Sequence, residues 1–235
     1  MNQSHFKKGL LDGLPIGLGY LSVSFAFGIF AVNSGLSAAE ASFVSMTCMT
    51  SAGQLAAVPI MTGGGSLLEL IISQIIINLR YSLMSISLSQ KLDAGVTTVH
   101  RFAIAFFNTD EIFAVASSQP WQVSRFYMYG LGVLPWIGWA GGTIAGALAG
   151  NILPAIVTAS LGVAIYGMFI AIVVPVARQE RPVAACVAIA VALSCAFTFV
   201  PALQKIPSGF TVILCAVAAS AIMAILAPIP EEVEA

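Results

Sequence analysis

The stretch FYMYGLGVLPWIGWAGGTIAGALA, residues 126–149, is a continuous apolar run without a charged side chain. A helix of about 18 residues or more is long enough to cross the hydrocarbon core of a bilayer. Strands of a membrane barrel would instead alternate apolar and polar residues, and this run shows no such alternation. The stretch therefore predicts a membrane-spanning α-helix.

Similar apolar segments occupy most of the remaining chain. They lie near residues 14–32, 41–61, 67–90, 102–118, 155–177, 183–200 and 209–227. Hydrophobic residues make up 59% of the chain and charged residues only 8%, whereas a soluble domain carries roughly a quarter charged residues. Because the connections are short, we expect a single transmembrane domain over residues 1–235. The predicted fold is an all-α, polytopic integral membrane protein with about seven or eight hydrophobic helices.

Two topologies fit the positions of Lys and Arg, which concentrate in the cytoplasmic loops of membrane proteins. If all eight segments cross and the N-terminus is cytoplasmic, Lys91, Arg101 and Lys205 fall outside. If segments 41–65 and 102–118 are instead re-entrant or discontinuous, only Lys205 remains outside. Both topologies place the two termini in the cytoplasm. The second fits the charges better, and its two segments are the most polar and interrupted ones.

Glycine recurs every four residues in two of the segments. The two series are Gly9, Gly13, Gly17 and Gly138, Gly142, Gly146, Gly150. Stripes of small residues allow helix backbones to approach closely in lipid. The partner of each stripe is either another helix of this chain or a second chain.

A cationic side chain lies deep in the segment near 67–90, within Asn78-Leu79-Arg80-Tyr81. Arg80 is about 15 Å along a helix from Lys91, too far for its charge to reach that interface easily. A buried charge in a membrane needs a partner, water or a function. Its planar guanidinium suits either a substrate carboxylate or a structural ion pair with a neighbouring helix.

Two adjacent acids, Asp110 and Glu111, interrupt the apolar segment near 102–118. Successive helical residues point about 100° apart, so one acid can pair with Arg80 while the other faces a cavity. A carboxyl group in such surroundings suits a proton relay or an ammonium-binding group. The alternative is that this segment begins at the interface and both acids are simply hydrated.

A third polar interruption is Ser51-Ala52-Gly53-Gln54, which precedes Pro59. Gln54 can bond either a substrate or backbone groups that a broken helix leaves free; helix packing is the alternative role. We predict helix breaks at Pro15, Gly53 and Pro59, because glycine and proline interruptions are typical of discontinuous transporter helices.

The polar motifs resemble those of the AzlC family, whose members are the larger subunits of bacterial branched-chain amino-acid exporters. The resemblance lies in Gly13-Leu14-Pro15-Ile16-Gly17, Ser51-Ala52-Gly53-Gln54, Asn78-Leu79-Arg80-Tyr81 and Thr109-Asp110-Glu111, in this order. It implies a multi-pass protein of the bacterial plasma (inner) membrane that works with a small hydrophobic AzlD-type subunit. It further implies export of leucine, isoleucine, valine and similar apolar amino acids, driven by the proton motive force.

The leading hypothesis is therefore a secondary exporter of an apolar zwitterion. Arg80 would bind the substrate carboxylate, with Gln54, Asn78 and the neighbouring Tyr81 as further substrate-binding residues. Asp110 or Glu111 would bind the ammonium group or carry the coupled proton.

Other function classes have weaker support in the sequence. The four cysteines lie singly in apolar segments, the two histidines fall near segment edges, and no hydrolase or metalloprotease motif occurs. We therefore expect no enzyme, cofactor, metal site or nucleic-acid partner. A structural subunit of a membrane complex and a passive small-solute channel remain the alternatives.

Overall fold

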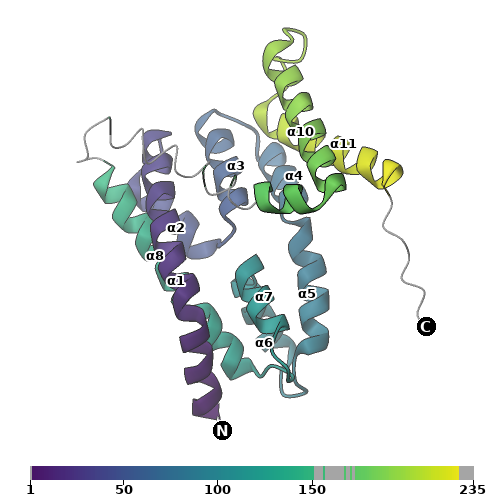
Figure 1. Cartoon of the computed structure of the whole chain (residues 1–235). Coiled ribbons are helices and arrows are strands. Elements are labelled where there is room, and N and C mark those ends of the chain that lie inside the picture. The colour runs from purple at the N-terminus through teal and green to yellow at the C-terminus, as the bar shows by residue number, and fades with distance from the viewer. Residues whose placement is uncertain (1, 151–155, 157–166, 168–169, 171–172, 228–235) are drawn as a thin grey trace.

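The computed structural model describes residues 2–150, 156, 167, 170 and 173–227, and the elements named from these residues are all α-helices (Figure 1). Two long helices, α1 (Asn2–Asn33) and α8 (Arg125–Ala149), run side by side in the same direction. We call the end where both begin the N-terminal end of the bundle and the other the far end. The hydroxyl of Ser124 bonds His5, which joins the two helix starts.

The glycine stripes form the contact between α1 and α8. A Cβ atom at Gly13 would lie 2.5 Å from the carbonyl oxygen of Leu131, and one at Gly17 would lie 2.8 Å from that of Leu134. A Cβ at Gly138 would in turn overlap the carbonyl oxygen of Gly17. The two backbones are therefore in direct contact, as small-residue stripes permit, and both stripes pack within this chain.

The segment near 41–61 forms a helical hairpin that enters from the far end. Helix α2 (Ala38–Thr47) begins after α1 ends, with Ser37 as its N-cap. The chain turns at 48–50, and α3 (Ser51–Thr62) returns until Thr62 lies near Gly35. The hairpin packs on α8, where Ser45 bonds Thr143 at 2.8 Å.

The segment near 67–90 is a bent span. Helix α4 (Leu67–Ile77) starts at the far end, and α5 (Leu79–Lys91) continues to the N-terminal end with a bend of 43° between them. Asn78 is both the C-cap of α4 and the N-cap of α5. Together the two helices pass the length and hydropathy requirements of one membrane span.

The segment near 102–118 forms a second hairpin, which enters from the N-terminal end. It consists of α6 (Thr98–Phe107) and α7 (Asp110–Ser117). The chain leaves the bundle end at Leu92 and returns to it at Val123, where the two residues form a parallel bridge. The Val123 N–H donates to the Lys91 carbonyl at 2.9 Å, and the Asp93 N–H donates to the Val123 carbonyl at 3.0 Å. Residues 93–122 therefore begin and end at the same end of the molecule.

This arrangement agrees with the discontinuous topology. It gathers five of the nine Lys and Arg residues at the N-terminal end: Lys7, Lys8, Lys91, Arg101 and Arg125. Among the described residues four helices are long and apolar enough to cross a membrane, or five with the bent pair. This count is lower than the expected seven or eight, because two apolar segments are hairpins. Most of the segment near 155–177 lies outside the described residues.

Helices α10 (Arg181–Phe199) and α11 (Ser208–Leu226) pack against each other beside α4 (Figure 1). Glu69, in the first turn of α4, is only 3% exposed and accepts a hydrogen bond at 2.8 Å from the backbone N–H of Gly209. The carboxylate thereby occupies the positive N-terminal end of α11, a favourable position for a negative charge.

Candidate functional site

Three helix interruptions meet in the middle of the bundle: the turn at 48–50 in the first hairpin, Asn78 in the bent span and the turn at 108–109 in the second hairpin. A cavity of about 240 Å³, which we call the junction cavity, lies between them. Its lining includes Thr50 from the first hairpin, Asn78 from the bent span and Asn108 from the second hairpin. Helices α3, α5 and α7 begin at these interruptions, and α2, α4 and α6 end there. Helix N-termini with a partial positive charge and C-termini with a partial negative charge therefore both lie around this cavity.

Threonine side chains cap two of these helix starts. Thr50 Oγ1 accepts from the Gly53 N–H and donates to Asn78 Oδ1 at 2.8 Å, which ties the first hairpin to the bent span. Thr109 Oγ1 accepts from the Ile112 N–H at the start of α7. The caps satisfy backbone groups that a broken helix would otherwise leave free.

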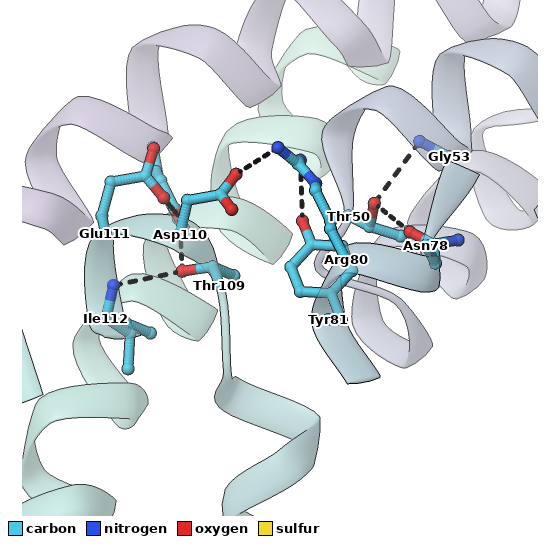
Figure 2. A network of polar contacts seen from close by, with 10 residues as sticks. Thr50, Gly53, Asn78, Arg80, Tyr81, Thr109, Asp110, Glu111 and Ile112 are labelled. Atoms are coloured by element: carbon cyan, nitrogen blue, oxygen red, sulfur yellow. Dashed lines mark hydrogen bonds and ion pairs between the residues drawn. The ribbon is translucent and has the colours of Figure 1, made fainter. Parts of the chain in front are cut away.

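A larger cavity of about 570 Å³, the central cavity, adjoins the junction cavity between the middle of α1 and the two hairpin tips. Arg80 of α5 and Asp110 of α7 form an ion pair across it, with 2.9 Å between Nη1 and Oδ2 (Figure 2). Their side chains are 50% and 46% exposed. Both side chains therefore reach the cavity instead of being sealed in protein, and a ligand in the cavity can contact either of them.

Tyr81 orients the guanidinium from beside it. An Nη2 hydrogen of Arg80 points to the Tyr81 hydroxyl at 3.3 Å, and the guanidinium carbon lies 5.0 Å from the centre of the tyrosine ring. The ring face attracts a cation. Tyr81 and Arg80 both line the central cavity.

Glu111 has a separate partner. The Tyr20 hydroxyl of α1 donates to Glu111 Oε2 and lies 2.7 Å from Thr109 Oγ1. Tyr20 packs edge-on against Trp139, with ring centroids 5.4 Å apart. The expected division between the two acids is therefore present: Asp110 pairs with Arg80, and Glu111 lies elsewhere on the same cavity wall.

Gln54 and Asn78 lie behind the central cavity. Gln54 is 1% exposed; its amide donates to the Cys48 carbonyl at 2.6 Å and accepts from the Trp139 indole at 3.2 Å. It thus bonds a backbone group freed at the turn, one of the three roles that the sequence allowed, and it is not among the residues that line the central cavity. Asn78 donates to the Gln74 carbonyl at 2.9 Å and lines the junction cavity.

The helices break at positions other than those expected from glycine and proline. Pro15 lies inside the continuous α1 and Pro59 inside α3. Gly53 belongs to the first turn of α3, where a Cβ would lie 2.6 Å from Gln74 Oε1. The interruptions are at 48–50, Asn78 and 108–109. A proline ring removes only one backbone donor, and membrane helices tolerate that loss.

Sequence reasoning missed several polar residues of the site. Tyr20 gave no signal of its own, since its direct neighbours Gly19 and Leu21 are not polar. Thr50 and Asn108 directly precede the polar motifs at Ser51 and Thr109, but nothing in their residue type distinguishes them as site residues. Thr109 did carry one: a threonine followed by two acids is typical of a helix start. Among the residues the structure describes, no cluster of His, Cys, Asp or Glu could hold a metal ion.

The arrangement can bind a small ligand that carries both charges. The central cavity presents one guanidinium and two carboxylates, and apolar side chains such as Ile16, Val23 and Met49 form the rest of its wall. Its volume falls within the roughly 300–1,000 Å³ of small-molecule sites. Broken helices around a site at mid-depth are a recurrent feature of secondary transporters.

Comparison with known proteins agrees with the motifs. The family model described as AzlC protein matches residues 15–153. The chain is 34% identical over 191 residues to an uncharacterized membrane protein of Archaeoglobus fulgidus, covering 80% of this chain and 84% of that protein. It is 30% identical over 190 residues to the inner membrane protein YgaZ of Escherichia coli, covering 77% and 76%. No solved structure gives a significant match. The chain is a membrane protein and belongs to the AzlC family.

Proposed function

We propose that this protein is a secondary exporter of branched-chain and similar apolar amino acids. The observation that carries the proposal is the cluster of Arg80, Asp110 and Glu111 on one cavity at the meeting point of the broken helices. A zwitterion needs both of its charges matched in a low-dielectric site, whereas its side chain needs only an apolar wall.

In the proposed bound state the substrate carboxylate takes the place of Asp110 on Arg80. Guanidinium and carboxylate form two parallel hydrogen bonds, stronger than a single contact with an ammonium group would be. The substrate ammonium group then bonds the released Asp110 or Glu111. Gln54 and Asn78 act as positioning residues, because they hold the hairpin tip and the helix junction that present these side chains.

Charge balance favours coupling to one proton. With both acids ionised, the charged lining residues Arg80 (+1), Asp110 (−1) and Glu111 (−1) sum to −1. A bound zwitterion adds no net charge, so one carboxylate remains uncompensated. A proton on that carboxylate neutralises the loaded site. The free energy of moving the substrate through the membrane interior is lower when the loaded site carries no net charge.

The proposed location is the bacterial plasma (inner) membrane, with the N-terminus in the cytoplasm. The basic residues at the N-terminal end of the bundle support this orientation, because cytoplasmic loops carry an excess of Lys and Arg. We further propose a small hydrophobic AzlD-type subunit as the partner, and neither an enzymatic activity nor a cofactor.

Leucine transport in proteoliposomes, with and without the small subunit and across an imposed pH gradient, tests the proposal. We expect Arg80→Lys to raise KM for leucine by about tenfold, the effect of one lost charge-assisted hydrogen bond. Asp110→Asn should abolish the response to the pH gradient or strongly reduce uptake. The matched controls are Arg178→Lys and Asp93→Asn, which lie outside the cavity lining.

The alternatives give different results. Normal leucine transport in both cavity variants would contradict the assigned roles. Leucine flux that ignores the pH gradient in the unmodified protein would indicate a passive channel. A complex that transports leucine with Arg80 and Asp110 both replaced by alanine would indicate that the partner forms the pathway and that this chain is structural.

A further inference from the structure

A groove of about 270 Å³ lies between α5 and α6, outside the central cavity. Near the N-terminal end of the bundle it is lined by Thr98 and Arg101, and at its inner end by Ser85 and Asn108. Between them lie apolar side chains, among them Phe102. We call this the α5–α6 groove. Its lining combines an apolar wall with polar groups at both ends.

The three cavities are adjacent to one another. Ala105 and Asn108 line both the α5–α6 groove and the junction cavity. Met49, Tyr81 and Thr109 line both the junction cavity and the central cavity. The three cavities therefore lie next to one another in a row from the basic N-terminal end to the Arg80–Asp110 pair.

Asn108 separates the first two cavities and has an unused hydrogen-bond acceptor. The residue is 4% exposed, and its Nδ2 donates to Ser85 Oγ at 3.1 Å. Its Oδ1 atom is buried and has no hydrogen-bond partner among the described residues. A buried acceptor without a donor costs about 1–3 kcal/mol, so its presence calls for an explanation. An acceptor of this kind matches a ligand that brings an N–H or O–H donor.

We infer that the α5–α6 groove and the junction cavity form the route between the N-terminal end and the central cavity, and that Asn108 Oδ1 binds the ammonium group of the passing amino acid. This inference rests on the proposed function. Leu88, Phe102 and Ile104 of the groove provide an apolar surface for the substrate side chain.

Arg101 and Asn108 act in succession on this route. Arg101 lies in α6 and Asn108 is the C-cap of that helix, seven residues later. The two are about 10 Å apart along the helix axis, further than the separation of the two charges in one amino acid. Arg101 at the mouth attracts the carboxylate, and Asn108 then meets the ammonium group. The Asn108–Ser85 hydrogen bond closes the passage in this structure, so the route opens when the tip of the second hairpin moves away from α5.

Thiol labelling tests the route itself. Single cysteines are introduced at Ser85 and Ser89, which line the groove, and at Leu83 and Ile86, which are 68% and 61% exposed elsewhere on α5. The background carries all four native cysteines, Cys48, Cys186, Cys195 and Cys215, as alanine, because Cys48 itself lines the junction cavity; its residual labelling gives the baseline. The probe is a membrane-impermeant cationic methanethiosulfonate added to either side of oriented vesicles.

We expect reaction of Ser85→Cys and Ser89→Cys from the side of the N-terminal end, and none above baseline at Leu83→Cys or Ile86→Cys, because these two face lipid. Leucine should slow the reaction of Ser85→Cys by about tenfold. Equal reaction at all four positions, or none at Ser85 and Ser89, would overturn the route. If Ser85→Cys and Ser89→Cys react only from the N-terminal side but leucine does not slow the reaction, the route stands and leucine is not the substrate that uses it.

Substitution of Asn108 tests the ammonium contact. Asn108→Asp keeps an acceptor at Oδ1, whereas Asn108→Leu has a similar size and none. We expect Asn108→Leu to raise KM for leucine presented at the N-terminal side by about tenfold, with Asn108→Asp close to the unmodified protein. Equal losses in both variants together with a lowered Tm would instead assign Asn108 a purely structural role and contradict the inference.

Discussion

At the scale of single residues, Arg80 and Asp110 could be predicted as site residues from the sequence. An ionisable side chain inside an apolar segment is costly in a membrane, so its presence indicates a partner or a function. The sequence also allowed one of the two adjacent acids to pair with Arg80 while the other faces a cavity. In the structure Asp110 pairs with the guanidinium and Glu111 bonds Tyr20. Tyr20 itself could not be predicted, since a single tyrosine in α1 resembles any membrane-embedded aromatic residue.

Tyr20 provides a prediction at this scale. Tyr20→Phe removes the hydroxyl that donates to Glu111 and keeps the ring that packs against Trp139. We expect the protein to fold normally and to lose about tenfold in leucine transport, because a carboxylate loses one hydrogen bond of about 1.5 kcal/mol. Transport and Tm are measured together. A lowered Tm with unchanged transport would show that the hydroxyl serves stability alone.

Gln54 provides a second residue-scale prediction. Gln54→Leu fills a similar volume but leaves the Cys48 carbonyl and the Trp139 indole without their partner. Each of these two buried groups costs about 1–3 kcal/mol when left unpaired, so we expect a loss of about 2–6 kcal/mol in stability. Thermal unfolding in detergent measures it as a lower Tm. The control is Gln122→Leu, an exposed loop position, which should change Tm little.

At the scale of elements, the sequence identified the interrupted segments but misplaced the breaks. Segments 41–65 and 102–118 were recognisable because polar residues divide them. We predicted breaks at Pro15, Gly53 and Pro59, because proline and glycine often interrupt helices. The helices instead break where Thr50, Asn78 and Thr109 precede a new helix. Which interruption ends a helix depends on tertiary partners such as the Gln54 amide, and these are not visible in one local window.

The contact between α1 and α8 gives a prediction with an internal control. Gly138→Ala would push a methyl group into the Gly17 carbonyl, whereas a Cβ at the nearby Gly141 meets no atom within 4 Å. We expect Gly138→Ala to lose about 1–3 kcal/mol of stability from overpacking. Gly141→Ala should gain up to about 1 kcal/mol from helix propensity. Equal effects of the two variants on Tm would mean that α1 and α8 are not in backbone contact.

At the scale of the whole molecule, the two hairpins enter from opposite ends and their tips meet at the bent span. Each hairpin contributes one helix whose N-terminus lies at this meeting point, α3 from one side and α7 from the other. The positive ends of the two helices therefore converge at the depth of the cavities. This convergence explains how a chain with four or five spans among its described residues can still enclose a polar site.

The topology that follows is testable by the side from which single cysteines react. Gly95 and Gln122 lie in the loops that flank the second hairpin, and Asn33 ends α1 at the far end. Because residues 92 and 123 pair at the N-terminal end, we expect Gly95→Cys and Gln122→Cys to react with an impermeant thiol reagent only from the cytoplasm. Asn33→Cys should react only from the opposite side. If Gly95→Cys and Gln122→Cys instead react from opposite sides, α6 and α7 cross the membrane, and the tip that brings Asp110 to Arg80 cannot exist as described.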